Sequence, residues 1–144
     1  MAFRFETLLK LRKNVEDLVQ KDFAGANNHL LSQKKRLGFM REVEDDSKKQ
    51  LDLQTKERVD INTMHLYNHF FEGIRIQENF QKKIIAEIFP KVEEKRKALA
   101  EAMRKRKTLE ILKDRERRAL QRERLKQETA LLDEVAATQW QRRQ

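Results

Sequence analysis

Only 3 glycines and 1 proline occur among the 144 residues, and this scarcity constrains the fold more than any other feature. Sharp reversals of a chain tend to use Gly, Pro, Asn or Asp, so a chain poor in Gly and Pro forms few, long elements. Charged residues make up 40% of the sequence, and the heavy use of Ala, Glu, Lys, Leu, Arg and Gln is typical of coiled coils. We therefore expect a narrow apolar seam between long helices rather than a compact core.

The first helix is expected over about residues 4–57. Its start carries apolar residues at the spacing of a coiled-coil seam, namely Phe5, Leu8, Leu11, Val15 and Leu18. Gly25 weakens the helix, and the seam resumes, displaced by about one position, at Leu30, Leu37 and Met40. We interpret this stretch as one helix with a weak point, the alternative being a break at Gly25.

A turn is expected over about residues 58–63, where Asp60, Asn62 and Thr63 are each able to cap a following helix. The second helix is expected over about residues 63–139. Pro90 interrupts it, and we predict a kink there, the alternative being a new helix that begins at Pro90. The sequence thus predicts an all-α fold, an antiparallel coiled-coil hairpin formed by the single domain 1–144. Phe5 would lie opposite a residue near 115, and the longer second helix would overhang.

The second helix has more apolar residues than a two-helix seam can bury. We assign one stripe to the seam: Leu66, Phe70, Ile74, Ile84 and Ile88. A second set is expected to lie off this stripe: Tyr67, Phe71, Ile76, Ile85 and Phe89. The second set is either a docking surface for a partner or a local thickening of the core.

Positive charge gathers in residues 91–128, which contain 15 Lys or Arg and 8 Asp or Glu. The pattern favours a solvated helix face for most of these residues, and a protein groove lined with acidic residues is also a good match. Nucleic acid is a weaker alternative, because this segment has no aromatic residue for stacking bases and its acids alternate with its bases. A further apolar patch follows, ending in the sole tryptophan: Leu131, Leu132, Val135, Ala136 and Trp140.

The sequence offers little that would support catalysis or metal binding. It has no cysteine, no glycine-rich phosphate loop and no arrangement of Ser32 or Ser47 that suggests a nucleophile. His65 and His69 have the i, i+4 spacing of zinc ligands, with Glu72 as a third candidate, but we favour surface histidines. We expect no cofactor, no metal, no signal peptide and no membrane insertion.

The opening, from Met1 to Arg12, alternates aromatic and leucine residues and ends in Leu-Arg. Two further segments, Thr108–Lys113 and Leu131–Ala136, lie nearer the other end of the chain. In these three segments the chain resembles the FliJ family, the small soluble component of the flagellar type III export apparatus. Pro90 is not part of the family pattern.

The resemblance implies a non-enzymatic stalk, similar to the gamma subunit of rotary ATP synthases and to the stalk proteins of virulence secretion. Such a stalk inserts into the pore of a hexameric export ATPase, links it to the membrane export gate and contacts export chaperones. It would be cytoplasmic and peripherally associated with the inner face of the cell membrane at the flagellar base. The alternatives are a generic coiled-coil scaffold or dimerising rod and, less favoured, a nucleic-acid-binding helix.

We assign two sets of contact residues within this expected stalk. Tyr67 and Phe71 are assigned to the export gate, because both belong to the apolar set that is expected to lie off the seam. The contacts with the ATPase ring are assigned to the apolar residues near the two chain ends and to the arginines of the overhang: Phe5, Leu8, Arg117, Arg118, Arg122, Arg124, Leu131, Leu132 and Val135.

Overall fold

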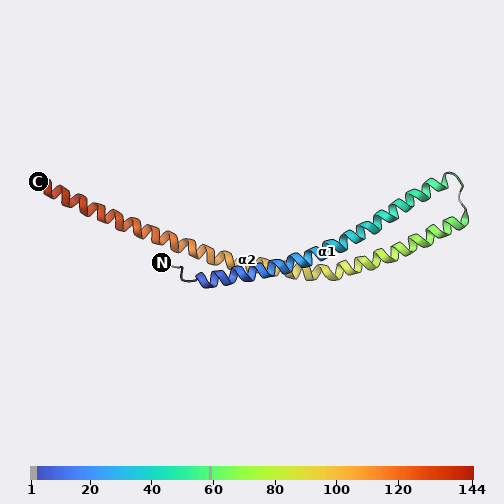
Figure 1. Cartoon of the computed structure of the whole chain (residues 1–144), viewed down its shortest axis with the longest axis horizontal. Coiled ribbons are helices and arrows are strands. Elements are labelled where there is room, and N and C mark those ends of the chain that lie inside the picture. Colours follow the sequence, from blue (N-terminus) through green and yellow to red (C-terminus); the bar gives the residue numbers. More distant parts are fainter. Residues whose placement is uncertain (1–2, 59) are drawn as a thin grey trace. The chain divides into compact units, whose positions relative to one another are not determined.

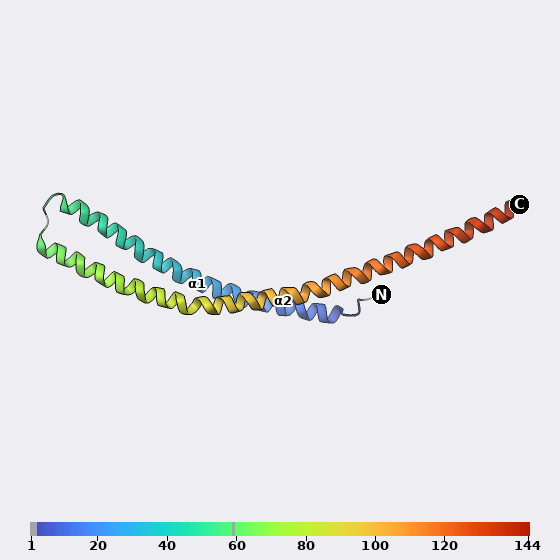
Figure 2. The same cartoon turned by 180° about the vertical axis from the view of Figure 1, so that it is seen from behind.

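The computed structural model describes residues 3–58 and 60–144, and these residues form two long helices with no strand among them. Helix α1 spans Glu6–Thr55 and helix α2 spans Ile61–Arg143. The helices lie side by side and antiparallel, joined by a short connection (Figures 1 and 2). The all-α hairpin predicted from the sequence, with a longer second helix, is therefore confirmed. Met1 and Ala2 of the opening motif, and Val59 of the predicted turn, lie outside the described residues.

Asp60 is the residue that caps the start of α2. The backbone N–H of Asn62 donates to Asp60 Oδ1 at 3.4 Å, and the N–H of Met64 donates to the Asp60 carbonyl at 3.1 Å. The bond from Asn62 satisfies a donor of the first helical turn, which has no partner within the helix, and the bond from Met64 is the first backbone bond of the helix itself. Of the three cap candidates, Asn62 and Thr63 lie inside that first turn.

Neither Gly25 nor Pro90 ends a helix. α1 continues through Gly25, whose backbone φ is not positive. α2 continues through Pro90, so no new helix begins there. A proline inside a helix costs about 3 kcal/mol. The seam continues on both sides of it, with Ile88 half-buried and Val92 almost fully buried, and this burial holds the helix together across Pro90.

The packing between the two helices divides the chain into two compact units. We call the first the end unit, because it holds both chain ends: the described residues up to Asp17 with Ala100–Gln144. We call the second the turn unit, because it holds the connection between the helices: Leu18–Leu99. Each unit has its own stretch of the seam, defined here as the positions at which α1 and α2 face each other.

In the turn unit the seam repeats every seven residues, with alternating steps of three and four, as in a coiled coil. On α1 the seam residues, all buried or half-buried, are Val19, Phe23, Ala26, Leu30, Gln33, Leu37, Met40, Glu44, Ser47 and Leu51. On α2 they are Tyr67, Phe71, Ile74, Glu78, Gln81, Ile85, Ile88, Val92, Lys95 and Leu99. No displacement of the pattern occurs at Gly25.

In the end unit the same period places Leu9 and Leu109 in the seam, and both are buried. Arg12, Glu16 and Arg106 are half-buried at the seam positions that follow. The seam predicted for the start of the first helix is therefore wrong by one position. Leu11 is 54% exposed and Leu18 is 68% exposed, with Val15 on the same outer flank. Phe5 is also exposed, although it keeps the seven-residue spacing of the seam to Arg12. The error has a physical cause, because charged side chains occupy the true seam and leucines occupy its flank.

The seam predicted for α2 is also partly wrong. Leu66 is 70% exposed and Phe70 is 42% exposed, although both were assigned to the seam. Tyr67 and Phe71, which were expected off the seam, are half-buried within it. Ile74 and Ile88 lie in the seam as expected, and so does Ile85, which was not expected there.

Polar side chains join the helices across the seam. In the turn unit, Gln81 Nε2 donates to Gln33 Oε1 at 2.7 Å and to the Gln33 carbonyl at 3.0 Å. Lys95 Nζ lies 2.8 Å from Asp22 Oδ1. Polar groups within a coiled-coil seam favour one register, because any shift leaves them without partners.

Candidate partner-binding surfaces

The last part of α2 has no covering helix. Every residue from Ile111 to Gln144 is exposed. α1 begins opposite Lys113, whose Nζ lies 3.0 Å from Glu6 Oε2, close to the predicted register. We call residues 121–143 the overhang. At about 1.5 Å per residue it projects as roughly 35 Å of single helix. In Figure 1 it is the orange to red end of α2.

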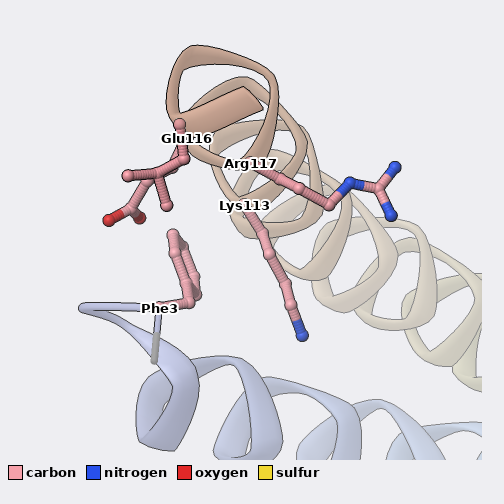
Figure 3. A pocket seen from close by; sticks show the side chains of 5 residues that line it. Phe3, Lys113, Glu116 and Arg117 are labelled. Carbon is pink, nitrogen blue, oxygen red and sulfur yellow. The ribbon is translucent and has the colours of Figure 1, made fainter. Parts of the chain in front are cut away.

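A shallow hollow of about 170 Å³ marks the base of the overhang. Figure 3 shows the Phe3 ring pointing toward α2 between Lys113 and Glu116, while the Arg117 guanidinium extends away from the ring. The Lys113 ammonium donates a hydrogen bond to Glu6 and so lowers the pKa of that carboxyl. These contacts fix the N-terminal segment against α2 and leave the overhang free.

The apolar residues of the overhang do not continue the seam. A helix advances about 100° per residue, so Val135, Leu132 and Leu125 fall roughly 70°, 130° and 150° around the helix from the line of Leu109 and Leu120. All three overhang residues are exposed. A stripe turned away from α1 is positioned for a different partner. Leu131 and Trp140, also exposed, lie on either side of it.

The four arginines assigned to the ATPase ring lie at the start of the overhang and on the turn before it, and all are exposed: Arg117, Arg118, Arg122 and Arg124. By the same rotation they fall within an arc of roughly 160° that also contains the apolar stripe. Arg117 has a neighbour of opposite charge, Asp114 Oδ1 at 3.5 Å, on the exposed helix surface. The stripe is thus bordered by cationic side chains.

The structure does not bring all the predicted ring contacts together. Phe5 directly precedes α1 and Leu8 lies in its first turn, and the Arg4 guanidinium stands 5.5 Å from the Phe5 ring centroid. Leu131 lies 18 residues beyond Lys113, which corresponds to roughly 27 Å along the helix. The nine residues therefore form two groups within the end unit, one at its base and one on the overhang.

A second surface runs along one flank of the turn unit. Phe39 of α1 and Phe80 of α2 are exposed and line a groove of about 590 Å³ with Ile76, Met40 and Ile84. Nearer the turn, Leu66, Tyr67 and Phe70 line a second hollow with Ser47. We call these two hollows the apolar flank. The sequence analysis missed Phe39 and Phe80, whose signal is their heptad position beside the seam on adjacent helices.

Tyr67 and Phe71 belong to an aromatic cluster that links the seam to the apolar flank. The Tyr67 and Phe71 rings lie 6.1 Å apart between centroids, and the Phe70 and Phe71 rings 5.9 Å apart. The argument that assigned Tyr67 and Phe71 to the export gate required them to lie off the seam, and their burial contradicts that premise. Leu66 and Phe70 present the exposed part of this cluster.

His65, His69 and Glu72 are exposed on α2. Across residues 3–58 and 60–144, no three potential ligands among Asp, Glu and His come together as a metal ion requires. Neither described helix has a stretch that is long and apolar enough to cross a membrane.

Comparison with known proteins identifies the chain. The family model described as "FliJ: Flagellar FliJ protein" matches residues 1–144. A search of curated proteins and a search of solved structures each found no match. The family match extends over the opening segment, both helices and the overhang, in agreement with the resemblance of the three sequence segments. The chain therefore belongs to the FliJ family and is a component of the flagellar protein-export apparatus.

Proposed function

We propose that this chain is the non-enzymatic stalk of the export apparatus, with its overhang inside the central pore of the hexameric export ATPase. The observation that carries the proposal is the overhang itself. It is a single helix whose apolar stripe faces away from α1 and is bordered by exposed arginines. Within the hairpin, α1 does not extend along this part of α2, so the stripe has no helix of its own chain to pack against.

A helix in a pore gains affinity from both features of this surface. The apolar stripe, with Leu125, Leu132 and Val135, loses its exposure to water when it is enclosed. The arginines attract acidic groups on the pore wall, which speeds capture and is screened beyond about 8 Å at physiological salt. Phe5 and Leu8, at the base of the end unit, are proposed to meet the rim of the pore.

The test reverses the four arginines together, as Arg117→Glu, Arg118→Glu, Arg122→Glu and Arg124→Glu. We expect this variant to lose binding to the purified export ATPase and stimulation of ATP hydrolysis, while its circular dichroism remains helical. A second variant, truncated after Glu128, removes most of the apolar stripe and is expected to weaken the same binding.

A matched control reverses four exposed lysines of α1 instead: Lys21, Lys34, Lys35 and Lys49. Each charge reversal removes two units of charge, so both variants fall equally from the net charge of +9. The control is expected to retain ATPase stimulation. If the arginine variant stimulates hydrolysis as the wild type does at both low and high salt, the overhang does not act in the pore.

For the turn unit, we propose that its apolar flank docks on the membrane export gate, with Tyr67 and Phe71 supporting the exposed Leu66 and Phe70. Apolar side chains exposed in a contiguous groove are typical of docking surfaces. Export chaperones are proposed as further partners of the chain. The chain is proposed to act in the cytoplasm, at the inner face of the membrane beneath the flagellum.

The second candidate is a scaffold that dimerises through its exposed apolar residues. The apolar flank favours this candidate, because a second copy of the chain is able to cover it. Light scattering of the purified chain distinguishes the two: a stalk is monomeric alone and binds the ATPase ring, whereas a scaffold is a stable homodimer. A steep dependence of binding on salt with DNA or RNA as the probe would indicate a nucleic-acid-binding helix instead.

A further inference from the structure

One polar position in the turn-unit seam differs in kind from the others. Gln33 pairs with Gln81, and Asp22 pairs with Lys95, so each donor has an acceptor. Glu44 of α1 and Glu78 of α2, in contrast, place two carboxyl groups in the seam within hydrogen-bonding reach of each other. Two carboxylates cannot hydrogen-bond unless one of them carries a proton.

The surroundings of Glu78 make an ionised pair unfavourable. Glu78 is only 9% exposed, and its Oε1 atom is buried without a hydrogen-bond partner. Burial of a charged carboxylate is costly when its oxygens are not paired. Glu44 is better supported, since Lys48 Nζ lies 3.3 Å from Glu44 Oε1. The proton of the pair is therefore expected on Glu78, whose O–H donates to the Glu44 carboxylate.

Charged groups from both helices act on this pair. From α1, Lys48 favours ionised Glu44 and Arg41 favours ionised Glu78. From α2, Arg75 acts on Glu44 and Lys82 on Glu78. These cations do not cancel the effect of the facing carboxyl. The hydrogen bond with Glu44, followed by burial, raises the pKa of Glu78, and the hydrogen bond with Glu78 lowers the pKa of Glu44.

We propose that Glu44 and Glu78 form a proton-binding pair that closes the turn-unit seam when it holds one proton and loosens it when both carboxyls are ionised. The pair lies next to the groove of the apolar flank, since Gln77, adjacent to Glu78 in the sequence, and Gln81, about one turn further along α2, line that groove. Proton binding at the seam is thereby linked to the shape of an exposed apolar surface.

The sign of the pH dependence follows from the two shifts. The stability contributed by Glu78, whose pKa is raised, is fully present below the ordinary glutamate value of 4.5 and is lost as the pH rises through its pKa. The stability contributed by Glu44, whose pKa is lowered, is present above 4.5 and is lost as the pH falls through its pKa. The singly protonated pair therefore stabilises the seam most near 4.5, and less on either side.

The direct test is an NMR titration of the glutamate side-chain carboxyls in the full-length chain, with Glu78→Gln used to assign the Glu78 signal. We expect Glu78 to titrate above 4.5, the ordinary value. In Glu44→Gln its midpoint should fall, because the facing carboxylate is gone. A Glu78 that titrates at or below the ordinary value, or a midpoint that Glu44→Gln leaves unchanged, overturns the proposal.

A second measurement tests the loosening itself. The chain has no cysteine, so spin labels placed by Glu42→Cys and Asn79→Cys, both at exposed positions beside the pair, are specific. We expect their distance distribution to broaden between pH 4.5, the ordinary glutamate value, and about pH 8. The added substitution Glu78→Gln should keep it narrow at both pH values.

The control pair of labels lies in the end unit, at Lys10→Cys and Lys107→Cys, which are also exposed. Its distance distribution is expected to be the same at both pH values. If the labels at 42 and 79 show one distribution at both pH values in the wild-type background, the pair does not regulate the seam. The same conclusion holds if the control labels broaden equally.

Discussion

Charged and amide side chains occupy seam positions that coiled coils usually fill with leucine. In the end unit, Arg106 donates to Glu16 across the seam and, at 2.8 Å, to Glu110 one turn along α2. Partial exposure keeps these ions in contact with water, which reduces both their attraction and the cost of burying them. Their main effect is on register, because a slip of the helices would separate the arginine from Glu16.

The apolar residues of the seam carry most of the stability of the end unit, and two leucines test this. Leu9→Ala empties a site that is 2% exposed, and we expect it to lower the free energy of unfolding by about 2–3 kcal/mol. Leu11→Ala removes the same atoms from the exposed outer flank and should change it by less than about 0.5 kcal/mol. Urea unfolding followed by circular dichroism measures both changes. Equal losses of stability in the two variants would support the seam predicted from the sequence instead.

At the scale of the helix, both elements remain continuous through residues that disfavour helices. Gly25, Gly38 and Gly73 are exposed, and an added Cβ at each would meet nothing within 4 Å. None has a positive φ. The hairpin therefore has no internal requirement for glycine at these positions, and the helices tolerate the entropic cost because seam burial exceeds it.

Alanine at these positions is expected to stabilise the helices. Gly25→Ala and Gly38→Ala should each raise the free energy of unfolding by about 0.5–1 kcal/mol, because alanine loses less backbone freedom on folding. Ala24→Gly, at an exposed position on the same helix, is the matched reversal and should lower it by a similar amount. Thermal unfolding measures all three, and a loss of stability in either alanine variant would show that α1 needs its glycine.

The sequence was sufficient to predict the two helices, and the approximate register across the hairpin, because few residues allow a turn and because Asp60 is a strong cap. It was not sufficient to predict which face of each helix is buried. Glu16, Gln81 and Glu78 look like surface residues in the sequence, so apolar periodicity selected the neighbouring leucines and aromatics instead. The overhang was predictable from helix lengths alone. The groove beside Phe39 was not, because residues of both helices line it and its prediction needs their relative positions.

At the scale of the whole molecule, the two units present different chemistry to partners. The end unit offers a single helix with a cationic border, and part of its affinity should therefore weaken with salt. The turn unit offers an apolar flank, whose binding should depend much less on salt. This division agrees with a chain that connects two different assemblies, as proposed for the ATPase ring and the export gate.

The gate contact can be separated from the stability of the seam by two double variants of the same aromatic cluster. Leu66→Ala with Phe70→Ala removes its exposed part. We expect the free energy of unfolding to change by about 1 kcal/mol or less. Binding to the purified cytoplasmic part of the export gate should weaken tenfold or more, which corresponds to about 1.4 kcal/mol.

Tyr67→Ala with Phe71→Ala removes the seam part of the cluster. In contrast to the first double variant, we expect it to destabilise the fold strongly. Both rings are half-buried between the helices, so their loss should lower the free energy of unfolding by about 3 kcal/mol or more. Calorimetric titration of each variant gives its affinity for the gate, and thermal unfolding gives its stability independently.

If the variant lacking Leu66 and Phe70 is stable and still binds the gate as the wild type does, the apolar flank near the turn is not the docking surface. If the variant lacking Tyr67 and Phe71 is fully stable and only its binding is lost, these two residues contact the gate directly and the seam does not depend on them.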